Sequence, residues 1–234
     1  MIGLAIPLAT VLSYAAGWAA GVPLLVPVFN TCAGFPFMVV ALRRGDVTLA
    51  ITRMLIWALT LAVCATLLSF AQPWRTDTLF IHGAAYRTEM FAWVMSGRGA
   101  ESDPSRFLPQ HALHAVVFML LALASAGVLA LAMGAVLMNY MGHYVGTLAA
   151  SSAHPVVTMI LGWVPWAIVR IVSFVAIGVT LSTPVLSRLG GFRVDAARAR
   201  RVMLVALGGL VLDVVMKWLM APAWQRLLLR VVGW

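Results

Sequence analysis

Charged residues are missing from two long stretches of the chain, and apolar residues fill both. The first 42 residues contain no Asp, Glu, Lys or Arg, and neither do the 63 residues between Arg106 and Arg170. A soluble domain needs charge across its surface, whereas 18 or more apolar residues without charge are typical of a transmembrane helix. The pattern predicts an all-α, polytopic transmembrane helical bundle that forms one integral membrane domain over residues 1–234.

Breaks in the apolar pattern set the number of spans. Residues 2–42 are too long for one crossing, and Gly21, Pro23 and Pro27 mark either a hairpin of two spans or a re-entrant piece. Residues 111–187 hold two or three spans, with breaks at 142–143 and 162–165. We therefore expect six or seven spans in total. Beyond the first stretch they lie near 47–71, 111–138, 144–162, 166–187 and 202–220, followed by an interfacial tail helix.

Basic residues are concentrated in short segments between the predicted spans. The net charge is +9, with one cluster at Arg43, Arg44 and Arg53 and five arginines from Arg188 to Arg201. Cytoplasmic loops carry such an excess of Lys and Arg, so both clusters should face the cytoplasm and anionic lipid. This placement favours three spans in residues 111–187. It also makes lipid, and not nucleic acid, the expected partner, with the bacterial inner membrane as the expected location.

Residues 73–110 form the longest polar segment, and its acidic and basic residues balance. A neutral segment opposite the basic clusters is expected on the outer side. Within it, Tyr86, Met90, Trp93 and Val94 share one side at helical spacing. This spacing predicts a short helix that lies in the interface, with its aromatic rings at headgroup level.

A ladder of small residues, Ala122, Ala126, Ala130 and Gly134, recurs every four positions in the predicted span 111–138. Small residues on one helix face allow close helix packing in lipid. The ladder predicts a packing face, either within this chain or toward a second copy or a partner membrane subunit.

Arg53 lies near the start of the span 47–71 and can reach the interface, but three further charged residues fall inside predicted spans, where charge is costly and marks functional candidates. Asp213 and Lys217 are four residues apart and predict an ion pair on one helix face. The pair would either fix the helix in the bundle or act as a proton- or ion-coupled switch; the alternative is that Lys217 only extends to the outer interface. Arg170 lies near the start of its span, where it would reach the interface or bind an anion in a cavity.

Two histidines, His111 and His114, open a predicted span with a three-residue spacing. The spacing puts both imidazoles on one helix face, where they could bind a divalent transition metal with a carboxylate. Carboxylates in the adjoining segment are Glu89, Glu101 and Asp103. The alternative is that both histidines are interfacial polar residues that cap the helix and meet headgroups.

A polar patch over residues 139–154 contains Asn139, His143 and His154. Two histidines on separate helices could ligate a haem. The same residues could line a polar substrate cavity or form ordinary hydrogen bonds between helices. We carry Asn139, His143 and His154 as candidate substrate-binding residues together with Arg170, Asp213 and Lys217.

Three functional hypotheses follow. Broken apolar segments with polar residues at depth favour a transport- or permease-like protein with a polar intramembrane site. The small-residue ladder and the outer segment would equally serve a non-catalytic subunit or scaffold of a membrane complex. A metal-dependent membrane enzyme would use His111, His114 and an acidic residue. The chain contains no potassium-filter, Walker A or serine-hydrolase motif.

Overall fold

The computed structural model describes residues 2–190, 192 and 195–233, which fold into an all-α bundle without strands. The helices are α1 (Ile2–Ala20), α2 (Leu25–Arg43), α3 (Val47–Ala71), α4 (Pro73–Leu79), α5 (Gly83–Ser96), α6 (Pro104–Ala124), α7 (Val128–Ala150), α8 (Pro155–Gly162), α9 (Pro165–Arg188) and α10 (Ala196–Val232). Six of these, α2, α3, α6, α7, α9 and α10, are long and apolar enough to cross a membrane. The predicted polytopic bundle is confirmed.

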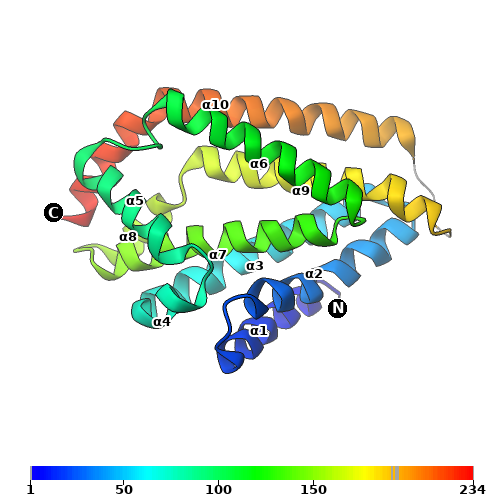
Figure 1. Cartoon of the computed structure of the whole chain (residues 1–234), viewed down its shortest axis with the longest axis horizontal. Coiled ribbons are helices and arrows are strands. Elements are labelled where there is room, and N and C mark those ends of the chain that lie inside the picture. The colour runs from blue at the N-terminus through cyan, green and yellow to red at the C-terminus, as the bar shows by residue number, and fades with distance from the viewer. Residues whose placement is uncertain (1, 191, 193–194, 234) are drawn as a thin grey trace.

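The long helices run side by side, and the connections between them gather at two ends of the bundle (Figure 1). The helices α4, α5 and α8 and the C-terminus lie at one end, and the α2–α3 and α9–α10 connections lie at the other. The Arg43 guanidinium lies 5.6 Å from the centre of the Phe192 ring. The two predicted basic clusters are therefore at the same end, although Arg193 lies outside the described residues.

A tight turn at residues 125–127 separates α6 from α7, which corrects the predicted span 111–138. Ala126 and Gly127 take positive φ values of 52° and 92°, a conformation that ends a helix. The small-residue ladder is therefore not one helix face. Ala122 lies in the last turn of α6, Ala126 lies in the connecting turn, and Ala130 and Gly134 belong to α7. Ala122 and Ala130 are buried within this chain, so the ladder offers no continuous face to a partner.

The predicted break at Gly142 and His143 is also wrong, because α7 continues through both residues. A Cβ atom added at Gly142 would lie 2.5 Å from Ala65 Cβ. One added at Gly146 would collide with the Thr66 carbonyl oxygen. These glycines therefore permit close packing of α7 on α3.

The break at 162–165 is confirmed, but the predicted span 144–162 is wrong. The chain leaves α7 at Ala150 and forms the short helix α8 before α9 begins at Pro165. The last span also differs, because α10 runs without interruption for 37 residues. At 1.5 Å per residue it is about 55 Å long and extends well beyond a hydrocarbon core of about 30 Å.

The polar segment 73–110 contains the predicted short helix, α5, but this helix packs on protein. Met90, Trp93 and Val94 are buried as the spacing predicted, in a cluster with residues of α7 and α10. The Gln225 side-chain amide of α10 donates a hydrogen bond to the Val94 carbonyl oxygen. The helix α5 therefore belongs to a folded cap over one end of the bundle, and its predicted face meets protein and not headgroups.

Candidate functional site

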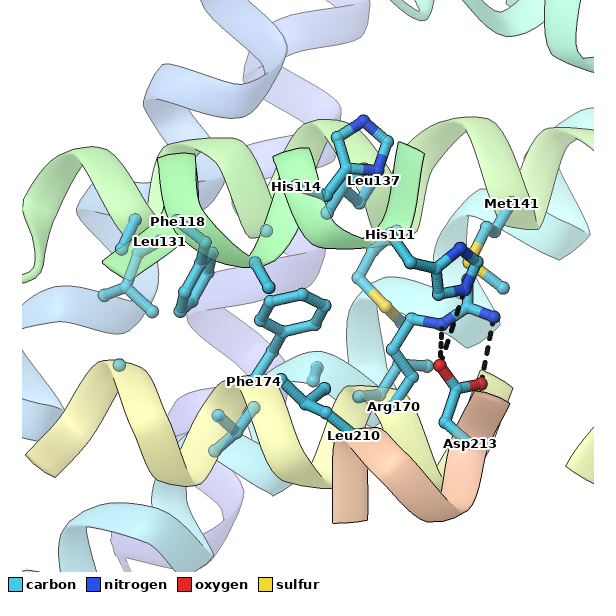
Figure 2. A pocket seen from close by; sticks show the side chains of 18 of the residues that line it. His111, His114, Phe118, Leu131, Leu137, Met141, Arg170, Phe174, Leu210 and Asp213 are labelled. Carbon is cyan, nitrogen blue, oxygen red and sulfur yellow. Dashed lines mark hydrogen bonds and ion pairs between the residues drawn. The ribbon is translucent and has the colours of Figure 1, made fainter. Parts of the chain in front are cut away.

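A cavity of about 390 Å³ lies inside the bundle, lined by residues of α3, α6, α7, α9 and α10. Most of its wall is apolar, and it includes Phe118 and Phe174. The polar groups come together at one end, where His111, Arg170 and Asp213 meet (Figure 2). The cavity therefore combines an apolar chamber with one charged end.

Arg170 and Asp213 form a bidentate ion pair across α9 and α10. Arg170 Nε lies 2.9 Å from Asp213 Oδ2, and Nη2 lies 3.0 Å from Oδ1. The Asp213 side chain is 1% exposed and that of Arg170 is 20% exposed. A buried carboxylate needs such a partner, because a planar guanidinium satisfies both oxygens together. The exposed part of Arg170 is the part that can meet a ligand.

His111 approaches the same carboxylate from α6. Its Nδ1 lies 2.9 Å from the Phe107 carbonyl oxygen, one turn earlier, and must donate a proton to that acceptor. Its Nε2 lies 3.4 Å from Asp213 Oδ2 and makes no hydrogen bond within the described chain. In the neutral imidazole this nitrogen is a lone-pair acceptor, so it faces another acceptor. Protonation would turn the contact into an attractive one.

Lys217 pairs with Glu101, which corrects the predicted pair of Asp213 and Lys217. Lys217 Nζ lies 2.7 Å from Glu101 Oε1 and 4.6 Å from the centre of the Phe107 ring. The four-residue spacing correctly puts both α10 residues on the buried face. Each then takes a partner from another element, Asp213 from α9 and Lys217 from the segment before α6.

Asn139 and His143 lie away from this cavity, in a separate network of hydrogen bonds. The Asn139 amide donates to Asn30 Oδ1 at 3.1 Å and its oxygen accepts from the Tyr14 hydroxyl. His143 Nε2 lies 2.7 Å from Asp77 Oδ1, and Nδ1 lies 3.1 Å from Ser69 Oγ. Both ring nitrogens are thus engaged inside the protein, which argues against haem ligation by His143.

His154 also lies away from the cavity. It is the exposed N-cap residue of α8, and its backbone N–H bonds to Ser152 Oγ at 3.0 Å. Of the six candidate substrate-binding residues, only Arg170 and Asp213 line the cavity.

The predicted metal ligands do not come together. His114 lines the cavity, but its ring points away from the Asp213 carboxylate (Figure 2). Glu89 is exposed on α5. Across the described residues, no group of three His, Cys, Asp or Glu side chains is placed to hold a metal ion. The bond from His111 to Phe107 turns the imidazole toward α10, which is why the three-residue spacing does not produce a paired site.

One residue of the predicted polar patch at 139–154, Tyr140, does reach this cavity. Tyr140 of α7 lines the cavity, and its ring centre lies 4.4 Å from that of Tyr86 in α5. Burial, and secondarily the charge of Glu101, raises the pKa of the Tyr86 phenol well above its usual value. Tyr86 therefore stays a neutral hydroxyl. Only the docking of α5 on α7 brings the two rings together.

No family model, curated protein or solved structure matches the chain. Functional inference therefore rests on the site. The site consists of one buried ion pair, one imidazole with an unsatisfied nitrogen and an apolar chamber, all within the candidate membrane spans.

Proposed function

We propose that this protein is a transport- or permease-like membrane protein whose solute site is the charged end of the cavity. The observation that carries the proposal is that the ion pair of Arg170 and Asp213 lines a cavity inside a bundle of six candidate spans. Ionisable residues at such positions characteristically belong to substrate or ion pathways. We further propose the bacterial inner membrane, with the basic end of the bundle toward the cytoplasm.

The depth of the site supports a solute pathway over an interfacial role. Arg170 lies five residues into α9, about 7 Å along the helix axis, and Asp213 lies 17 residues into α10. An arginine that only reached for headgroups would be directed outward. Arg170 is instead turned inward onto a carboxylate that is 1% exposed. A neutralised pair at this depth can exchange partners with a polar solute at lower cost than a lone charge.

The test uses liposomes that contain the purified full chain. It measures the flux of solutes across the bilayer and the flux of any protons that move with them. A pH-sensitive dye trapped inside, and labelled solutes from a panel of small amphipathic acids, alcohols and amines, report the flux. The double variant Arg170→Gln with Asp213→Asn removes both charges of the site and should abolish flux. The control Arg106→Gln with Asp103→Asn makes the same change in a surface pair, whose side chains are 70% and 43% exposed, and should keep it.

Two outcomes would overturn the transport proposal. One is a folded Arg170 and Asp213 double variant that moves solute as fast as the wild-type chain. The other is wild-type liposomes in which no solute of the panel moves faster than in protein-free liposomes.

A further inference from the structure

The cavity has exposed lining residues on both α6 and α10. Leu108 of α6 and Val211 of α10 both line it, yet they are 44% and 65% exposed. Residues that line a cavity and are also exposed lie at its mouth. Both belong to candidate membrane spans, so the medium outside this mouth is the bilayer. A ligand that uses it must already be dissolved in the membrane.

The shape and lining of the cavity define the body of such a ligand. The chamber between Phe118, Leu131 and Phe174 is apolar, and the charged end is confined to His111, Arg170 and Asp213 (Figure 2). A volume of about 390 Å³ is at the small end of the range for ligand cavities. It suits one apolar chain with one polar end better than a lipid with two chains.

The donors at the charged end define the head of the ligand. Arg170 uses Nε and Nη2 on Asp213, and Nη1 makes no hydrogen bond to the described residues. His111 Nε2 is unsatisfied and the Tyr140 ring lines the same cavity. A carboxylate has two acceptor oxygens, which match a guanidinium N–H and a neighbouring donor.

Counting charges selects a monoanion. The pairs of Arg170 with Asp213 and of Lys217 with Glu101 are each neutral. One bound carboxylate would then require one compensating charge, which a proton on His111 Nε2 supplies while it satisfies that nitrogen. The titratable groups around His111 are Asp213 and Lys217 of α10, Arg170 of α9, Tyr140 of α7, and Glu101, with His114 on its own helix. A phosphate dianion would leave one uncompensated negative charge in a low dielectric.

We propose that the cavity binds a single-chain monocarboxylate of the fatty-acid type, which enters from the bilayer between α6 and α10. The carboxylate lies on Arg170 and His111, and the chain lies between Phe118 and Phe174. This assignment names the substrate class of the proposed carrier and so rests on that function for its physiological meaning. Binding itself can be measured without any transport.

The binding test uses the full chain in nanodiscs of zwitterionic lipid and displacement of a fluorescent fatty acid. Dodecanoate should displace the probe with an affinity at least about ten-fold higher than that of dodecanol or of dodecyl phosphate. Dodecanol lacks the charge-assisted hydrogen bond, and dodecyl phosphate adds an unpaired negative charge. Titration in two buffers of different ionisation enthalpy should show uptake of about one proton per dodecanoate bound. Equal affinity for dodecanol, a preference for dodecyl phosphate or lysophosphatidylcholine, or no saturable binding would each overturn the proposal.

Neighbouring residues of α10 provide a matched pair of variants for the mouth. Val211→Trp places a large ring at the opening and should weaken binding of dodecanoate about ten-fold or more. Leu212→Trp changes the next residue, which is 49% exposed and does not line the cavity, and should leave binding unchanged. The double variant Arg170→Gln with Asp213→Asn should keep the fold and lose the preference for dodecanoate over dodecanol. Equal effects of the two tryptophans, or a retained preference in the double variant, would overturn the site.

Failure of this assignment is distinguishable from failure of the carrier. Selective binding of dodecanoate without flux in liposomes overturns the transport function and supports the ligand assignment. Flux of panel solutes without any preference for carboxylates supports the carrier and overturns the ligand assignment.

Discussion

At the scale of single residues, Asp213 has the most constrained surroundings in the site. Its carboxylate is almost completely buried, accepts two bonds from Arg170 and faces His111 Nε2 at 3.4 Å. Removal of one member of a buried ion pair leaves the other charge uncompensated, whereas removal of both leaves a neutral gap. The stability of double variants can therefore show which residue is the ion-pair partner of Asp213.

We predict that Asp213→Asn lowers the melting temperature of the purified protein, through a loss of about 3–5 kcal/mol of stability. Addition of Arg170→Gln should restore part of that loss. Addition of Lys217→Met should not, because Lys217 pairs with Glu101 and its own loss leaves the Glu101 carboxylate without a positive partner. Thermal unfolding in detergent measures all four proteins. Rescue by Lys217→Met and none by Arg170→Gln would contradict the observed pairing.

Asp103 carries a second residue-scale prediction, which concerns pH. The Ser105 hydroxyl, which donates to Asp103 Oδ1 at 2.7 Å, lowers the pKa of the Asp103 carboxyl. Because the folded-state pKa lies below the unfolded value of about 3.9, the N-cap of α6 stabilises fully above that pH. The contribution is lost as the pH falls through the lower folded value.

The difference in melting temperature between the wild type and Asp103→Ala should therefore shrink as the pH is lowered from 6 to 3. Melting curves at intermediate pH values locate the loss. A difference that stays constant over this interval would show that the carboxylate does not cap α6 through its charge.

At the scale of elements, α7 is the centre of the bundle, and its glycines set how closely α3 approaches. The run Met141–Ala149 is buried throughout. A Cβ at Gly146 would collide with the Thr66 carbonyl oxygen, whereas one at Gly208 of α10 would meet nothing within 4 Å. Glycine is therefore a packing requirement at Gly146 and not at Gly208.

We predict that Gly146→Ala destabilises the protein by about 1–3 kcal/mol, the usual cost of forcing extra volume into packed positions. Gly208→Ala, the matched control, should be neutral or slightly stabilising, since alanine is the better helix former. Thermal unfolding of both variants measures the contrast. Similar melting temperatures for the two would mean that α3 and α7 do not pack at Gly146.

At the scale of the whole molecule, the two ends of the bundle differ in the charge of their connecting segments. The cap of α4, α5 and α8 lies at one end, and the basic connections lie at the other (Figure 1). Arg75 lies 4.1 Å from the centre of the Trp18 ring, which fixes the end of α1 to the cap. From this arrangement and the positive-inside rule we propose that the cap lies on the outer side.

We predict that a cysteine introduced at Arg98 reacts with an impermeant maleimide from outside intact cells, and that one at Arg44 reacts only after the membrane is opened. Both positions are exposed, so accessibility and not burial decides the result. Cys32 and Cys64 are first replaced by alanine. Labelling of position 44 from outside would reverse the topology.

How far the sequence predicted the fold depends on the range of the interaction. The short helix in the segment 73–110 was predictable because Tyr86, Met90, Trp93 and Val94 recur at helical spacing over nine residues. The turn at Ser125–Gly127 was not, because alanine and glycine are equally typical of a packed membrane helix. Similarly, Gly142 resembles a break in the sequence, and only its contact with Ala65 shows that it is a point of close packing.

The sequence by itself determined the bundle, the common end of the two basic clusters, and the choice of Arg170 and Asp213 as candidate site residues. Each follows from a local rule. A segment that crosses lipid must be a long apolar helix, and a charged residue inside such a helix is costly and therefore rare. Tertiary structure alone decided that Asp213 meets Arg170, 43 positions away, and that Lys217 meets Glu101, 116 positions away. Helical periodicity fixes which face a side chain occupies, but which element covers that face depends on how distant helices pack. The cavity and its charged end exist only once that packing is complete.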